Sequence, residues 1–174
     1  EIYTGYEQKL RRMRRLDYDD MLVQTWQLFK ERPDILLAWQ KKYTYILIDE
    51  FQDINRIQYE IIRMMAKPEE NLFVVGDDDQ SIYRFRGAKP EILLGFTKDY
   101  PGAEMTVLNK NYRSTGAIVS RAEGLIRHNE YRYAKHMTAS REKGSEVLVK
   151  AFQKPTDQYL KMIREFCQEQ FVSK

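Results

Sequence analysis

The chain has 174 residues, of which 43% are hydrophobic and 13% aromatic, which is enough for a globular core and excludes a disordered chain. Its formal charge of +3 is too small to establish a nucleic-acid partner by itself. The single cysteine excludes an internal disulfide, and no apolar run approaches the roughly 18 residues of a membrane span, so we expect a cytoplasmic protein with no membrane partner.

The first 15 residues or so are charged and predict a helix. Their cations form a dense run that fits either a solvated helix face or a phosphate contact: Lys9, Arg11, Arg12, Arg14 and Arg15. Asp17 is the expected N-cap of a second helix, which should end before Pro33. A short helical piece over residues 35–39 follows.

A short apolar run from Tyr45 to Ile48 predicts a strand that is buried on both faces and ends in two acids, Asp49 and Glu50. Acids at the end of such a strand can hold a hydrated cation and position a water for attack on a phosphate. The alternative is that this stretch only caps the helix expected over residues 54–66, with Asp53 as N-cap. Capping accounts for Asp53 but not for the two preceding acids.

Leu72 to Val75 predicts a second buried strand, again followed by a glycine and acids, and Gln80 there could donate to a terminal phosphate. Residues 83–86 then alternate aromatic and cationic side chains. Such alternation suits single-stranded nucleic acid, because rings stack on bases while guanidinium groups meet phosphates. It equally suits a half-buried edge segment, with both rings in the core and the arginines in water.

The remainder of the chain continues the alternation of strands and helices. We expect a helix from Pro90, a third strand over residues 105–108, and a helix capped by Ser114 or Thr115, with these side chains facing inward: Ile118, Ala122, Leu125 and Ile126. A linker or long surface loop over residues 128–144, a strand over 146–152 and a helix after Pro155 complete the prediction. Alternating elements predict an α/β fold with a parallel sheet, and we expect a boundary that divides the chain into residues 1–108 and 109–174.

Four segments, in this order and spacing, closely resemble the UvrD/Rep family of superfamily 1 DNA helicases: residues 16–22 (LDYDDML), 49–53 (DEFQD), 74–88 (VVGDDDQSIYRFRGA) and 111–115 (NYRST). The resemblance implies a partial RecA-like P-loop NTPase core, with a parallel sheet flanked by helices and without the strand of the phosphate loop. Residues 1–108 would be the later part of the first RecA-like core. Residues 109–174 would begin the second.

The same resemblance implies roles at an ATP site. Asp49 would bind Mg²⁺, Glu50 would activate the hydrolytic water, and Gln80 would sense the terminal phosphate. Tyr112 would stack on the adenine, and Arg113 would act as an arginine finger. A solvent-exposed arginine on a capping turn is the alternative for Arg113.

For DNA, the resemblance implies that Tyr83 and Phe85 contact the single strand, where the family most often has tryptophan at the position of Phe85. Arg84 would meet a DNA phosphate. Arg86 would brace the acidic motif or the nucleotide phosphates.

The sequence has no Gly-x-x-x-x-Gly-Lys-[Ser/Thr] phosphate loop, so we expect a fragment of a larger helicase that is inactive alone. The parent would be an ATP-dependent DNA helicase that couples hydrolysis to movement on single-stranded DNA and to duplex unwinding. Its partners would be single-stranded DNA, duplex junctions and the remainder of the helicase chain. The alternative is a non-catalytic module that binds nucleic acid or a protein partner, and the motifs do not separate DNA repair from replication or from a helicase-nuclease.

Overall fold

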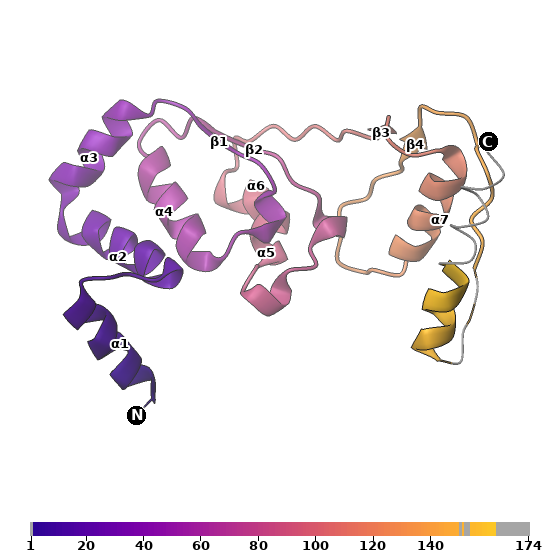
Figure 1. The fold of residues 1–174 in the computed structure, drawn as a ribbon. Coiled ribbons are helices and arrows are strands. Elements are labelled where there is room, and N and C mark those ends of the chain that lie inside the picture. The colour runs from indigo at the N-terminus through magenta and orange to yellow at the C-terminus, as the bar shows by residue number, and fades with distance from the viewer. Residues whose placement is uncertain (1, 150, 152–153, 163–174) are drawn as a thin grey trace, which may run out of the picture. The chain divides into compact units, whose positions relative to one another are not determined.

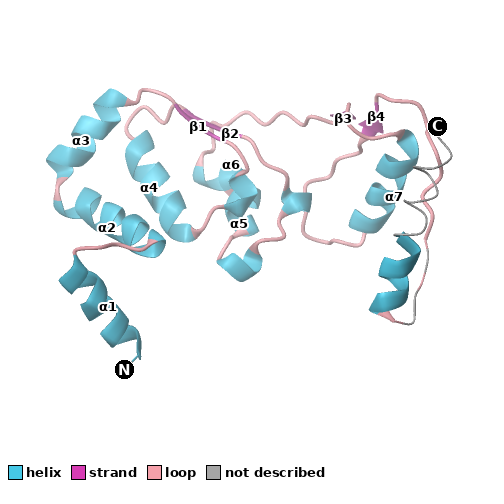
Figure 2. Cartoon of the chain, in the orientation of Figure 1, coloured by secondary structure: helices cyan, strands magenta, loops and turns pink. Residues whose placement is uncertain are grey.

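The computed structural model describes residues 2–149, 151 and 154–162, apart from the side chain of Arg86. The chain forms two compact units, one of Glu1–Val107 with Asn129–Ala134 and one of Leu108–His128 with Lys135–Lys174. Figure 2 shows that helices predominate and that the strands are short. Among the described helices, none combines the length and the apolar character needed to cross a membrane.

The first unit contains helices, a pair of strands and short 3₁₀ turns (Figure 1). The helices are α1 (Ile2–Met13), α2 (Tyr18–Glu31), α3 (Pro33–Lys42), α4 (Arg56–Ala66), α5 (Pro90–Leu94) and α6 (Phe96–Asp99). The strands are β1 (Ile46–Ile48) and β2 (Leu72–Val74), and the 3₁₀ turns are η1 (Phe51–Asp53), η2 (Asp78–Gln80) and η3 (Arg84–Arg86).

Side-chain caps fix the starts of two helices. Asp17 accepts from the backbone N–H of Asp20 at 2.8 Å and so caps α2, as predicted. Helix α4 is capped by Asn55, which accepts from the N–H of Gln58 at 2.9 Å, so the predicted cap at Asp53 is wrong. The reason is that Asp53 closes the 3₁₀ turn η1, which the extended Ile54 separates from α4.

Strands β1 and β2 pair in parallel, with Ile46 opposite Leu72 and Ile48 opposite Val74. The expectation that both faces of β1 are buried is wrong for the described chain, because Leu47 is 72% exposed and its register partner Phe73 is 62% exposed. Figure 1 draws α4, α5 and α6 below the strand pair. One face of the pair therefore packs on the core and the other carries exposed apolar side chains.

The core of the first unit is built around Phe51, which is fully buried directly after the first acidic pair. Its ring meets Tyr59 and Phe96 edge to face, at centroid distances of 6.0 and 5.5 Å. The Tyr59 hydroxyl donates to Asp99 at 2.6 Å, and burial together with this hydrogen bond raises the pKa of Tyr59. The segment that carries the acids is thus anchored in the core.

The second unit contains β3 (Lys110–Asn111), α7 (Gly116–Ile126) and β4 (Thr138–Ala139), and residues 155–162 are helical. Strands β3 and β4 pair in parallel. The start of α7 follows Thr115, but its first amides donate to the backbone carbonyls of Glu142 and Lys143 at 3.0 and 2.8 Å. The cap is therefore made by backbone from a later loop.

Three expectations for this region are wrong. Residues 105–108 form no strand, and neither do residues 146–149. Helix α7 buries Ala117 and Val119, whereas Ile118, Ala122 and Leu125 are exposed and only Ile126 of the predicted inward set is half-buried. Residues 150 and 152, and the helix positions Ile163, Phe166 and Cys167, lie outside the described residues.

We predict that Phe51→Ala lowers the free energy of unfolding by about 3–5 kcal/mol, because it empties the centre of the aromatic cluster. Urea denaturation of the chain measures this loss. Phe85→Ala is the matched control, since that ring is 77% exposed, and it should change stability by less than about 0.5 kcal/mol. Equal losses in the two variants would contradict the assignment of Phe51 to the core.

Candidate functional site

The parallel pairing of β1 and β2 brings the two acidic segments to the same edge of the strand pair. Beyond the last paired residues, the N–H of Val75 donates to the carbonyl of Ile48 at 2.8 Å, and the N–H of Phe51 donates to the carbonyl of Val75 at 2.9 Å. The backbone on both sides of the first acids, Asp49 and Glu50, is therefore fixed by hydrogen bonds. The second acidic segment, residues 77–79, begins two positions after Val75.

Asp49 and Glu50 are exposed at this edge, and Glu50 has an unusual backbone. Its φ of 52° lies in the left-handed region, which side-chain-bearing residues rarely adopt. The Glu50 N–H donates to Oδ1 of Asp49 at 2.9 Å. Two exposed carboxylates at a strand end offer the hard oxygen atoms that Mg²⁺ prefers, and one such carboxylate combined with substrate phosphates is a common way to hold this ion.

Gln52 links the first acids to the second acidic segment, and sequence reasoning missed it. Its side chain is buried, its Nε2 donates to Oε2 of Glu50 at 2.7 Å, and its Oε1 accepts from the N–H of Asp77 at 3.0 Å. A Cβ at Gly76 would lie 3.0 Å from that same Oε1, so any larger residue here would push against the Gln52 amide. Gly76, two positions after the end of β2, was the one signal in the sequence that could have indicated the contact.

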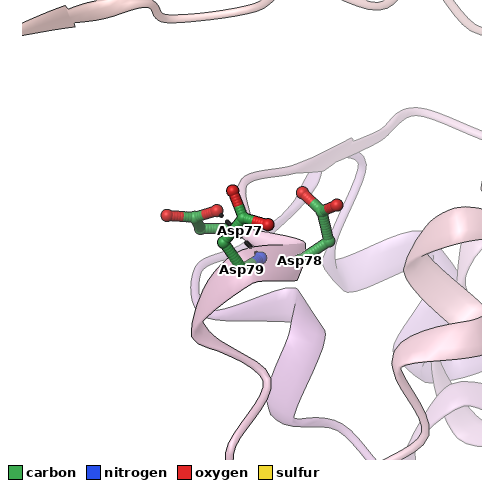
Figure 3. Close-up of side chains that lie close together, drawn as sticks. All are labelled: Asp77, Asp78 and Asp79. Atoms are coloured by element: carbon green, nitrogen blue, oxygen red, sulfur yellow. Dashed lines mark hydrogen bonds between the residues drawn. The ribbon is translucent and has the colours of Figure 1, made fainter. Parts of the chain in front are cut away.

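The carboxylates of Asp77, Asp78 and Asp79 lie close together, with one oxygen from each within 4.8 Å of the others (Figure 3). Asp77 accepts from the N–H of Asp79 at 3.1 Å and from Nε2 of Gln80 at 2.7 Å. Asp78 accepts from a backbone N–H and Asp79 from a guanidinium group, both supplied by residues 132–133. Each of the three carboxylates thus accepts a hydrogen bond, and Gln80 is held in place by Asp77.

The candidate DNA-contacting rings are exposed. Tyr83 is 37% exposed and Phe85 is 77% exposed, with their ring centroids 6.0 Å apart. The alternative that places both rings in the core is therefore wrong. Arg84 pairs with Glu91 at 3.0 Å on the surface, and the side chain of Arg86 lies outside the described part of the chain.

The second unit carries the other two predicted site residues on a turn after β3. Oδ1 of Asn111 accepts from the backbone N–H groups of Arg113 and Ser114 at 3.0 and 2.8 Å, which fixes the turn. Arg141 donates to the carbonyl of Arg113 at 2.8 Å. The Tyr112 ring is 69% exposed, and Arg113 is exposed as well.

Comparison with known proteins identifies similarity along most of the chain. Residues 1–101 match the family described as UvrD/REP helicase N-terminal domain. The chain is 52% identical over 141 residues to a putative ATP-dependent DNA helicase YjcD of Bacillus subtilis, covering 81% of this chain and 19% of that protein. It is 39% identical over 173 residues to the ATP-dependent DNA helicase PcrA of the same organism, covering 99% of this chain and 22% of that protein.

A PcrA of Leuconostoc citreum is 42% identical over 147 residues, covering 84% of this chain and 20% of that protein. The chain thus spans about a fifth of the length of the curated relatives it matches.

We predict that Gln52→Leu lowers the free energy of unfolding by about 1–3 kcal/mol, because Glu50 and the Asp77 amide lose a partner in a buried setting. Chemical denaturation of the chain measures the change. Gln24→Leu is the matched control, because Gln24 is exposed on α2, and it should stay within about 0.5 kcal/mol of the original chain. A Gln52 variant as stable as this control would show that the bridge contributes nothing.

Proposed function

The chain belongs to the UvrD/REP helicase family, and from that premise we propose that it is part of an ATP-driven motor that moves along single-stranded DNA and unwinds duplexes. In this proposal residues 1–108 are the later part of a first RecA-like core and residues 109–174 begin a second. The observation that carries the proposal is the bridge through Gln52, which connects the exposed acids after β1 with the loop of Gln80 after β2.

The proposed reaction is hydrolysis of the terminal phosphoanhydride of ATP. Glu50 orients a water and accepts its proton as the water oxygen bonds to the terminal phosphorus and the bond to the ADP oxygen breaks. Asp49 would hold Mg²⁺, which supplies charge neutralisation at the phosphates when bound. Gln80 donates its side-chain N–H to the terminal phosphate, and the exposed carboxylates and the Asp77 contact support these assignments.

The remaining assignments follow the family motif. Tyr112 stacks on the adenine, Arg113 supplies positive charge to the departing phosphate, and Arg86 braces the acidic motif or the nucleotide phosphates. The ring of Tyr112 and the guanidinium group of Arg113 are exposed on a turn that Asn111 fixes, and this exposure leaves both groups accessible to a ligand.

The DNA contact is proposed for the exposed segment around η3. Tyr83 and Phe85 stack on bases, and Arg84 meets a backbone phosphate. Only two residues separate Gln80 from Tyr83, so a movement of Gln80 with the terminal phosphate shifts the rings that hold the bases. This short spacing is the proposed link between ATP hydrolysis and movement on DNA.

We predict that Glu50→Gln in the full-length protein lowers DNA-stimulated ATP hydrolysis by about 10²-fold or more while leaving ATP affinity within a few-fold. The reason is that Glu50 acts on the water and not on the bound phosphates. Steady-state turnover and nucleotide binding are measured side by side, with Glu31→Gln as an exposed control expected to behave as the original protein. Full-length protein that binds DNA but never hydrolyses ATP would favour the non-catalytic alternative.

We predict that Phe85→Ala weakens binding of single-stranded DNA by about 1–3 kcal/mol, the usual loss for one stacked base. It should also reduce the stimulation of ATP hydrolysis at saturating DNA, because the ring transmits the movement. Phe85→Trp should retain both properties, and Tyr18→Ala, which removes another exposed ring, should change neither. Unchanged stimulation at saturating DNA would contradict the coupling role of this loop.

A further inference from the structure

A short segment beyond α7 returns to the first unit and holds its acidic loop. Residues 129–134 belong to the first unit, although the residues on both sides of them belong to the second. The Tyr133 hydroxyl donates to the carbonyls of Leu93 and Leu94 at 3.0 and 3.3 Å, and its N–H donates to Asp78 at 2.8 Å. Burial and the nearby Asp78 carboxylate raise the pKa of Tyr133. The sequence predicted only a linker or a long surface loop here.

Arg132 makes the strongest contact of this segment. Its Nε and Nη2 donate to the two carboxylate oxygens of Asp79 at 2.8 and 2.7 Å, across 53 positions of sequence. The side chains are only 15% and 13% exposed, so solvent screens this pair weakly. Arg32 and Asp34 form a pair of the same two-pronged geometry, but at 57% and 63% exposure. The contrast indicates a fixed contact at Asp79.

Asp79 in turn is connected to the candidate catalytic glutamine. The Asp79 N–H donates to Oδ1 of Asp77 at 3.1 Å, and Oδ2 of the same carboxylate accepts from Nε2 of Gln80 at 2.7 Å. The guanidinium group therefore fixes Asp79 through its side chain, and Asp79 fixes Asp77 through its backbone. A shift of the Asp79 backbone therefore displaces the carboxylate that holds Gln80.

We propose that Arg132 is a positioning residue for ATP hydrolysis, which aligns Gln80 through Asp79 and Asp77. This inference rests on the proposed function. Arg132 touches no nucleotide in this arrangement; it sets the orientation of the group that does. The two-pronged contact matters because a planar guanidinium group constrains the carboxylate in angle as well as in distance.

The test uses the full-length protein and measures kcat and KM for ATP at saturating single-stranded DNA. Arg132→Gln should lower kcat by about 10- to 100-fold, a loss typical of a slightly displaced reacting group, with KM and DNA affinity within about 3-fold. Arg132→Lys keeps the charge but loses the two-pronged geometry, so its kcat should be intermediate. Arg32→Gln is the matched control and should leave kcat unchanged.

Two combined variants separate positioning from a loss of folding. The double variant with Arg132→Gln and Asp79→Asn should have a kcat no lower than that of the slower single variant, because both changes break the same contact. Adding Arg132→Gln to Gln80→Ala should lower kcat no further, because the group that Arg132 aligns is already gone. If Arg132→Gln does not fold, the same comparison of kcat is made with Arg132→Lys, alone and combined with Gln80→Ala.

The proposal is overturned if Arg132→Lys and Arg132→Gln keep kcat within 2-fold, or if their effects multiply with that of Gln80→Ala. An original protein that binds DNA but shows no DNA-stimulated hydrolysis overturns the proposed function itself. An active original protein with fully active Arg132 variants overturns only the positioning role.

Discussion

The candidate site depends on one buried amide. Gln52 is 1% exposed, and its side-chain amide contains both a hydrogen-bond donor and an acceptor. It can therefore join an acceptor in one loop to a donor in another. It gives its N–H to Glu50 and accepts the N–H of Asp77. A buried amide left unsatisfied would cost free energy, so the two loops and Gln52 stabilise one another. The parallel strands bring the loops together, and Gln52 fixes their spacing.

The features predicted correctly from the sequence are local. The two short strands and the cap at Asp17 depend on residues within a few positions of one another, so local sequence patterns predict them without a structure. The resemblance to the helicase family also rests on local motifs, and the family match supports it. The roles of Asp49, Gln80 and Arg113 are proposals that follow from these motifs.

The features that were missed are non-local. Met105 to Leu108 has the composition of a strand, yet Met105 and Leu108 are 58% and 78% exposed and no strand forms there, because a strand needs a partner backbone as well as propensity. The contact between Arg132 and Asp79 spans 53 positions, and nothing in either local sequence indicates it. The inward face of α7 was mispredicted for the same reason, since burial depends on which element packs against the helix.

The left-handed backbone at Glu50 is also fixed by its surroundings. A non-glycine residue in that region costs about 1–3 kcal/mol, so the conformation persists only where its surroundings determine it. Here the strand bonds of Ile48 and Phe51 fix the backbone on either side, and Gln52 holds the carboxylate. The direction of the proposed base is thus set before any ligand arrives. Because Gln80 is connected to the same amide through Asp77, one buried side chain contacts the residues that hold both proposed groups, Glu50 for the water and Gln80 for the phosphate. Such preorganisation is what phosphoryl transfer requires.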